Sequence, residues 1–239
     1  MAQVEGSVVL VTGAQGGLGR EFVAQALARG AARVYATARS PQQWDDARIV
    51  PLRLDVTDDE SVAAAVQAAT DVTVVVNNAG IHGAGSLLGS PVCEVERVFA
   101  TNVFGALRVA KAFAPVLGRN GGGALVDVAS VLSWLGIAGA YSASKAALWS
   151  LTNSLRLELA PQGTQVLGAH LGYTDTPLIA GLDVEKNDPA DVVAAIWDAV
   201  EAGEREVLVD QVSRDVRAAL SGPLEALYPQ LGAPVAGGR

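Results

Sequence analysis

Tyr141 and Lys145 are the side chains in this sequence best suited to move a proton. They are four residues apart, so on a helix they lie on one face. A free tyrosine has a pKa of about 10 and is a poor base at neutral pH. A neighbouring ammonium group favours the tyrosinate and lowers that pKa. The pair therefore predicts general acid–base chemistry at the phenol.

A serine upstream of this pair is suited to polarise a carbonyl oxygen. Ser130 directly follows the apolar run Ala124–Ala129, and a hydroxyl there can donate to an oxygen on which negative charge develops. Ser133 is the alternative. Ser130 is preferred because it stands at the end of a predicted buried strand, where ligands bind in parallel sheets.

A glycine-rich turn near the start of the chain predicts a phosphate site. Its residues are Gly13, Gln15, Gly16, Gly17, Leu18 and Gly19. Glycine has no Cβ, so the backbone can bend tightly and a ligand can come close to it. The free N–H groups at the start of the following helix favour an anionic pyrophosphate. The spacing is Gly-x-x-x-Gly-x-Gly, which differs from the commoner dinucleotide fingerprint.

Arg39 bears on which dinucleotide would bind. In dinucleotide folds an acidic residue after the second strand binds a ribose 2′-hydroxyl, whereas an arginine accommodates a 2′-phosphate. The second predicted strand ends in Ala38 and Arg39, with no acid at its tip, and a guanidinium pairs well with phosphate. The sequence therefore favours NADP(H), with NAD(H) as the alternative if Arg39 is a solvated loop residue.

Strands and helices alternate along the whole chain, which places these residues at the ends of strands. The predicted strands are Ser7–Val11, Arg33–Ala38, Val50–Leu54, Val72–Val76, Ala124–Val128, Val166–His170 and Glu206–Val209. The predicted helices are Leu18–Arg29, Asp58–Ala69, Val92–Leu117, Tyr141–Ala160, Pro189–Ala202 and Val212–Leu220. This alternation predicts a doubly wound, Rossmann-type α/β fold with a mostly parallel seven-stranded sheet. We expect one domain over residues 1–239.

Composition excludes several classes of function. The formal charge of −8 argues against nucleic-acid binding. No apolar run reaches the roughly 18 residues that a membrane helix needs, and the N-terminus has no signal-peptide pattern. The chain has one cysteine and two histidines, His82 and His170, which predict no metal site. We expect a soluble, cytoplasmic protein. His170 is expected to be structural, while His82 is either a substrate contact or a solvated loop residue.

The motifs together resemble the short-chain dehydrogenase/reductase family, in its single-domain branch. They are Thr12–Gly19, Asn77–Gly80, Tyr141–Lys145 and Gly172–Thr176, in the family's order. The resemblance extends from residue 7 to about residue 220. Two departures stand out. Ten residues separate Ser130 from Tyr141, fewer than is common in the family, and Leu171 stands where many relatives have proline.

The resemblance implies a catalytic group and a nicotinamide cofactor. The implied catalytic residues are Asn102, Ser130, Tyr141 and Lys145. The implied cofactor-binding residues are Gly13, Gln15, Gly16, Gly17, Leu18, Gly19, Arg39, Asp55, Val56, Asn78, Ala79, Gly80, Tyr141, Lys145, Gly172, Thr174 and Thr176. Lys145 would also bind the nicotinamide ribose, and Thr176 the carboxamide. The Asn102 side chain would hold a water linked to Lys145. Asp55 and Val56 would contact the adenine.

The expected function is NADP(H)-dependent interconversion of a ketone or aldehyde and an alcohol, with Tyr141 as the general acid or base. A short apolar lid over residues 177–188 predicts a small or medium carbonyl substrate, and the segment after residue 222 is expected to be a flexible tail. Apolar residues on the two long helices, and the resemblance, predict a homodimer or homotetramer. Two alternatives remain: a 3-oxoacyl reductase acting on carrier-protein-linked substrates, and a non-catalytic NADP(H)-binding redox sensor.

Overall fold

The computed structural model describes residues 2–83 and 85–231. Within them, seven strands form one sheet in the order β3-β2-β1-β4-β5-β6-β7, and each neighbouring pair is parallel. The strands are β1 (Val8–Val11), β2 (Arg33–Ala38), β3 (Ile49–Arg53), β4 (Val74–Asn77), β5 (Ala124–Val128), β6 (Gln165–His170) and β7 (Glu206–Leu208). The predicted Rossmann-type α/β fold is confirmed, with a sheet that is parallel throughout.

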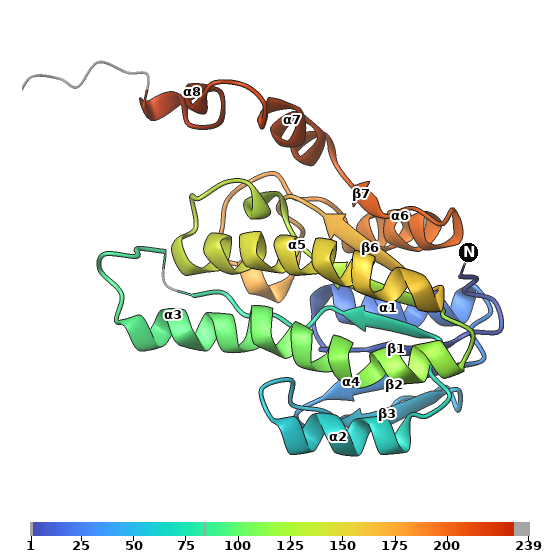
Figure 1. The fold of residues 1–239 in the computed structure, drawn as a ribbon. Coiled ribbons are helices and arrows are strands. Elements are labelled where there is room, and N and C mark those ends of the chain that lie inside the picture. Colours follow the sequence, from blue (N-terminus) through green and yellow to red (C-terminus); the bar gives the residue numbers. More distant parts are fainter. Residues whose placement is uncertain (1, 84, 232–239) are drawn as a thin grey trace, which may run out of the picture.

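Helices cover both faces of this sheet (Figure 1). They are α1 (Gly17–Ala28), α2 (Asp59–Ala68), α3 (Val92–Phe99), α4 (Ala106–Arg119), α5 (Gly139–Leu159), α6 (Pro189–Glu201), α7 (Gln211–Ala219) and the short α8 (Leu224–Leu227). Helices α1 and α6 pack on one face, and α2, α4 and α5 pack on the other. Successive strand residues therefore serve two cores, so Val9 and Val11 face the first and Leu10 the second.

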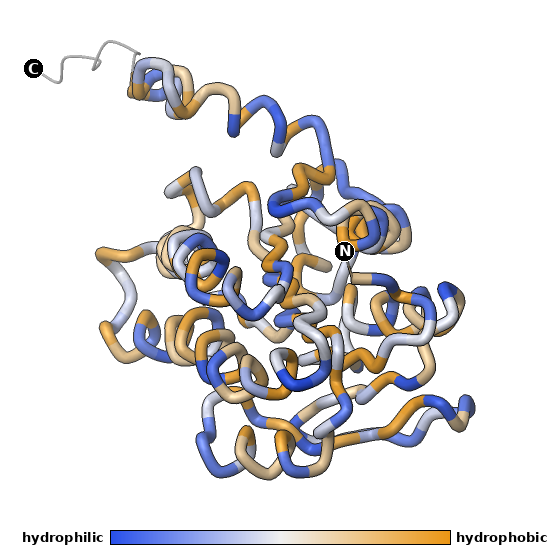
Figure 2. Tube along the Cα trace, turned by 45° about the vertical axis from the view of Figure 1, so that its right-hand side comes forward, coloured by the Kyte–Doolittle hydropathy of each residue, from blue (hydrophilic) through white to orange (hydrophobic). Residues whose placement is uncertain are grey.

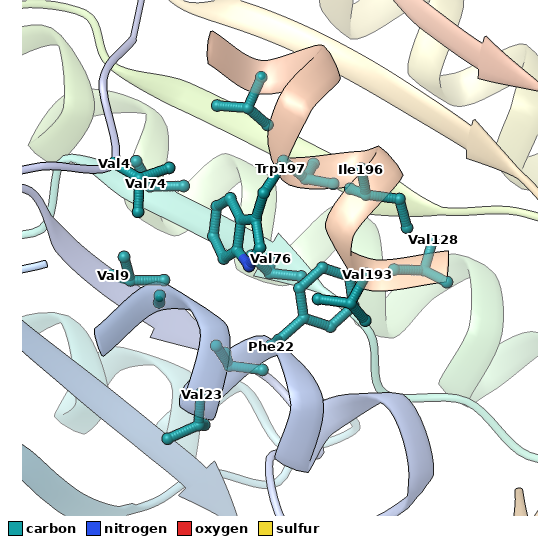
Figure 3. Close-up of a cluster of buried hydrophobic side chains, with 14 of the residues drawn as sticks. Val4, Val9, Phe22, Val23, Val74, Val76, Val128, Val193, Ile196 and Trp197 are labelled. Atoms are coloured by element: carbon teal, nitrogen blue, oxygen red, sulfur yellow. The ribbon is translucent and has the colours of Figure 1, made fainter. Parts of the chain in front are cut away.

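The first core is built around aromatic contact between α1 and α6. The rings of Phe22 and Trp197 meet edge to face, with centroids 5.7 Å apart and planes at 84°, and valines from the sheet surround them (Figure 3). Figure 2 shows hydrophobic residues along the strands and a mixture of hydrophobic and hydrophilic residues along the helices. That mixture is expected where one face of each helix packs on the sheet.

Two segments have features that the sequence did not predict. The helical stretch predicted from about Val92 to Leu117 is present and stays helical where its parts join, but Ala100–Gly105 between α3 and α4 is π-helical. Such insertions are costly in isolation and are retained where side chains make specific contacts, as Asn102 does below. The tail predicted after about residue 222 begins with α8 and the helical turn Pro229–Leu231, and its part beyond residue 231 lies outside the described residues.

The described residues contain no helix that is both long enough and apolar enough to cross a membrane. Within the same residues, no group of three histidine, cysteine or acidic side chains is placed to hold a metal ion.

Candidate active site

The carboxyl ends of the central strands open into a cavity of about 650 Å³. Ligands in open parallel sheets bind at this edge, where the strand order reverses; here that point is between β1 and β4. The cavity brings together most of the predicted site residues, namely Gly13, Gly16, Gly17, Leu18, Asn78, Ala79, Gly80, Ser130, Tyr141, Lys145, Gly172, Thr174 and Thr176. The predicted residues that do not line it are Gln15, Gly19, Arg39, Asp55, Val56 and Asn102.

The glycine-rich turn between β1 and α1 is tight enough to exclude side chains. A Cβ at Gly19 would lie 2.2 Å from the Gly13 carbonyl oxygen, and Gly13 itself has a φ of +65°. The Asn78 side chain holds the turn by donating to the Thr12 and Gly13 carbonyl oxygens at 2.9 and 3.2 Å. Thus the amide of Asn78 is already engaged in shaping the turn, and only its other atoms can approach a cofactor.

Tyr141 and Lys145 meet at the start of α5, next to the end of β5. The Lys145 Nζ lies 5.6 Å from the centre of the Tyr141 ring and donates to the Val128 carbonyl oxygen at 2.6 Å. Burial lowers the pKa of Lys145 to about 8 and raises the pKa of Tyr141 to about 12. The sequence predicted a lowered tyrosine pKa; here burial of the phenol shifts the pKa in the opposite direction.

The buried ammonium group of Lys145 predicts a distinctive dependence of stability on pH. In the unfolded chain Lys145 keeps its proton up to about 10.5, whereas the folded protein releases it near 8. Between these values the unfolded state binds more protons, so stability rises with pH. Above about 10 the raised pKa of Tyr141 acts in the opposite direction. Relative to Lys145→Met, the free energy of unfolding of the cofactor-free protein should therefore rise by about 2 kcal/mol between pH 8 and 10.

Urea denaturation of both proteins across this range measures the difference. Parallel pH profiles for the two proteins would show that Lys145 is not buried as an ammonium group.

Ser130, rather than Ser133, faces the cavity. Ser130 begins the turn Val131–Ser133, where its Oγ accepts from the Leu132 amide nitrogen at 3.1 Å and lies 3.4 Å from the Leu171 carbonyl oxygen. Ser133 is also buried, but it does not line the cavity. The place of Ser130 leaves its hydroxyl able to exchange a weak backbone contact for a ligand oxygen.

Asn102 lies in the π-helical segment, and its side chain is committed to protein partners. Its Oδ1 accepts from the Ile81 amide nitrogen at 2.9 Å. Its Nδ2 donates to the Ile81 carbonyl oxygen and to Ser144 Oγ, each at 3.0 Å. These three bonds tie the loop after β4 to α5. They differ from the expectation that this side chain holds a water linked to Lys145.

His82 stands beside the phenol of Tyr141. The two rings stack with centroids 4.7 Å apart and planes at 14°, and His82 lines the cavity. Its Nδ1 lies 3.0 Å from the Gly83 carbonyl oxygen, so that nitrogen carries a proton. Of the two readings of His82 from the sequence, this position favours the substrate contact.

A cluster behind Ser130 was not found from the sequence. The fully buried His170 presents Nδ1 to the Ser130 carbonyl oxygen at 3.1 Å and Nε2 to Glu206 Oε1 at 3.4 Å. Its ring stacks on Trp134, with centroids 4.2 Å apart. Mainly through His170, the pKa of the Glu206 carboxyl is held at about 2. Arg217 of α7 completes the cluster, with Nε 3.4 Å from Glu206 Oε2.

At the far end of the turn, basic side chains meet the loop after β2. Hydrogen bonds from Thr57 lower the pKa of the Asp55 carboxyl, and the charge of the exposed Arg39 adds a smaller effect in the same direction. Arg20, which no sequence motif singles out, donates to the Gln15 carbonyl oxygen at 2.9 Å and to Gln42 Oε1 at 3.4 Å.

Comparisons with known proteins match this chain to dehydrogenases and reductases. The family described as short chain dehydrogenase matches residues 7–187. The chain is 30% identical over 237 residues to the ketoacyl reductase HetN of a Nostoc species, covering 88% of this chain and 81% of the relative. A short-chain dehydrogenase from Burkholderia cenocepacia in complex with NADP has a TM-score of 0.90 and 34% identity, covering 97% and 100% of the two chains. A 3-ketoacyl-(acyl-carrier-protein) reductase from Brucella melitensis complexed with NADH has a TM-score of 0.79 and 25% identity, covering 86% and 97%.

Proposed function

Because this chain belongs to the short-chain dehydrogenase/reductase family, we propose that it is an NADP(H)-dependent oxidoreductase that interconverts a ketone or aldehyde and an alcohol. One observation carries the proposal: Ser130, Tyr141 and Lys145 line the same cavity as the glycine-rich turn. A proton donor, an oxygen-polarising hydroxyl and a dinucleotide cradle thus share one space. The bound nicotinamide would supply or accept the hydride.

The protein residues divide the remaining work. In reduction, the Tyr141 hydroxyl gives its proton to the carbonyl oxygen as negative charge builds there, and the Ser130 hydroxyl donates to the same oxygen. The raised pKa of Tyr141 keeps the phenol protonated at neutral pH, as a general acid requires. Lys145 would move from the Val128 carbonyl oxygen to the nicotinamide ribose and bring its charge nearer the phenol, which aids the reverse reaction. Asn102 holds the loop that carries His82.

The cofactor preference rests on the adenosine end of the site. One solved neighbour holds NADP and another NADH, so the fold accepts both. Arg39 stands where an acid would exclude a 2′-phosphate, and Arg20 adds a second guanidinium near the turn. We propose that Asp55 and Val56 bind the adenine, and that Gly172, Thr174 and Thr176 bind the nicotinamide end.

The proposal treats the chain as one domain with a substrate lid at residues 177–188, which contains the helical turn Pro177–Ile179. Exposed apolar side chains such as Phe104 and Leu157 support the expected association into a dimer or tetramer. Light scattering tests that association.

A carrier-protein-linked 3-oxoacyl reductase is the second candidate. It is supported by the printed activities of the Nostoc and Brucella relatives. Acidic carrier proteins bind basic patches, whereas this chain carries a net charge of −8, so we rank it second. The sensor alternative is weaker because Tyr141 and Lys145 are both present at the cavity.

Oxidation of NADPH in the presence of a panel of aldehydes, ketones and ketoesters tests the proposed function, with NADH as the parallel cofactor. Turnover of free carbonyl compounds supports the proposal. Turnover restricted to carrier-linked 3-oxoacyl groups would establish the second candidate. Tight NADPH binding with no turnover of either kind would favour the sensor.

We further expect His170 to act as a positioning residue for Ser130. Replacing His170 with Leu removes the hydrogen bond to the Ser130 carbonyl oxygen, and a small displacement of a reacting group is costly. We expect kcat to fall about tenfold with little change in the KM for NADPH. His170→Asn keeps a donor near the position of Nδ1 and should restore much of the loss.

A double-mutant cycle distinguishes positioning from a general loss of stability. In a Ser130→Ala background, His170→Leu should have almost no further effect on kcat, because its action passes through Ser130. If the loss of kcat in the double variant equals the combined losses of the two single variants, His170 does not act through Ser130.

A further inference from the structure

The mouth of the active-site cavity is ringed by hydrocarbon that faces water. Ile137 precedes α5, Leu178 lies in the helical turn after Thr176, and Val212 lies in α7. Their exposed fractions are 55%, 46% and 57%. All three line the cavity that contains Tyr141. We name these three residues the apolar lip. Exposed hydrocarbon that converges on a cavity from three elements marks a ligand-binding surface.

Hydrogen bonds to Asp210 join two of the segments that carry the apolar lip. The Asp210 carboxylate accepts from the Gly172 and Ser213 amide nitrogens, at 2.6 and 2.7 Å, and from Asn187 Nδ2 at 2.7 Å. One carboxylate thus joins the loop after β6, the end of the lid and the start of α7. A second tie closes the base of the lid, where the Asn187 amide nitrogen donates to the Tyr173 carbonyl oxygen at 2.8 Å. These bonds hold the two elements that carry Leu178 and Val212.

The charged side chains of the described cavity wall are already engaged or are acidic. Lys145 is bonded to a backbone oxygen, and the Lys186 Nζ lies 3.7 Å from an Asp175 carboxylate oxygen. Asp210 is occupied by the three donors above, and Glu185 is exposed. Along this part of the wall no unengaged cation is placed to receive a carboxylate or phosphate. With Glu185 and Asp210 adding negative charge to the same wall, this balance favours an uncharged ligand segment across the lip.

From this arrangement we infer that the substrate is a ketone or aldehyde, or the matching alcohol, with an unbranched aliphatic tail that leaves the cavity across the apolar lip. The inference rests on the proposed function and extends it from a small or medium carbonyl compound to a lipid-like one. The reacting carbon sits between Ser130 and Tyr141, and the tail covers Ile137, Leu178 and Val212. Its transfer from water supplies the driving force.

The test measures affinity and turnover across a series of methyl ketones from 2-butanone to 2-decanone. Calorimetry with the NADP⁺-loaded protein gives the affinity without reaction, because the oxidised cofactor has no hydride to donate. Each added methylene that reaches the lip should tighten binding about two- to fourfold, and kcat/KM with NADPH should rise in step. 9-Oxodecanoate, which ends in a carboxylate, should bind at least about tenfold more weakly than 2-decanone.

Variants of the apolar lip test whether the dependence of affinity on chain length arises there. Ile137→Ser and Val212→Ser should flatten the dependence of affinity on chain length, so that 2-decanone loses more affinity than 2-butanone. Val92→Ser is the matched control, because Val92 is 71% exposed and does not line the cavity; it should keep the full dependence.

The outcomes separate the inference from the function on which it rests. Affinity that is independent of chain length, or 9-oxodecanoate binding as tightly as 2-decanone, overturns the inference of an aliphatic substrate tail. Length-dependent binding without NADPH oxidation supports that inference and overturns the proposed redox function.

Discussion

Replacing Tyr141 with phenylalanine is expected to lower turnover by about 10²-fold or more, because the reaction loses its proton donor. The ring remains, so its stacking on His82 is retained, and the backbone that would contact the cofactor is unchanged. Affinity for NADPH should therefore stay close to that of the parent. Steady-state turnover on a good substrate, together with fluorescence titration of NADPH, measures both quantities.

The pH profile provides an internal control for this experiment. In the parent protein, oxidation of an alcohol requires the phenolate, and burial raises the pKa of Tyr141 to about 12 before cofactor binds. The oxidative rate should therefore increase with pH, whereas the residual rate of Tyr141→Phe should lack this dependence. A variant that keeps near-normal turnover would show that another group supplies the proton.

Replacing Arg39 with alanine should weaken NADPH binding by about ten- to a hundredfold and leave NADH nearly unaffected. A charge-assisted hydrogen bond to the 2′-phosphate contributes about 1.5–3 kcal/mol, and about 1.4 kcal/mol corresponds to a factor of ten. Ala38→Asp should go further and shift the preference toward NADH, because an acid repels the phosphate and accepts from the ribose hydroxyl. Titration of both cofactors against the three proteins measures these shifts.

Arg20 is the informative comparison for this prediction. Its guanidinium is hydrogen-bonded to the turn and to Gln42 and lies over the Trp44 ring at 5.7 Å. Arg39, by contrast, is exposed. If Arg20→Ala discriminates against NADPH more strongly than Arg39→Ala does, then the phosphate site lies at the start of α1 instead. Equal affinity of the parent for NADH and NADPH would remove the NADP(H) preference altogether.

The sequence was most informative where a local pattern determines the structure. The strands Arg33–Ala38 and Ala124–Val128 were predicted at their observed bounds, because short, mainly apolar segments are typical of strands buried on both faces. The glycine-rich turn was also identifiable, since its backbone conformation depends on the glycines within the turn itself.

Features that depend on distant partners could not be predicted in this way. The π-helical segment around Asn102 is stabilised by Ile81, which lies 21 residues away. The support of Ser130 by His170 joins residues 40 apart, and His170 alone in a sequence is indistinguishable from any buried histidine. The pKa of Tyr141 was predicted in the wrong direction, because burial cannot be read from the spacing of two residues.

The order of the strands has a consequence for how the chain folds during synthesis. β1 pairs with β2 on one side and with β4 on the other, and its β4 partners begin at Val74. Until that residue has left the ribosome, one edge of the apolar strand Val8–Val11 has no neighbour. An unpaired edge of this kind is a template for association with other chains. A strand that is central in the finished sheet is thus open at one edge in the nascent chain, until pairing with β4 covers that edge.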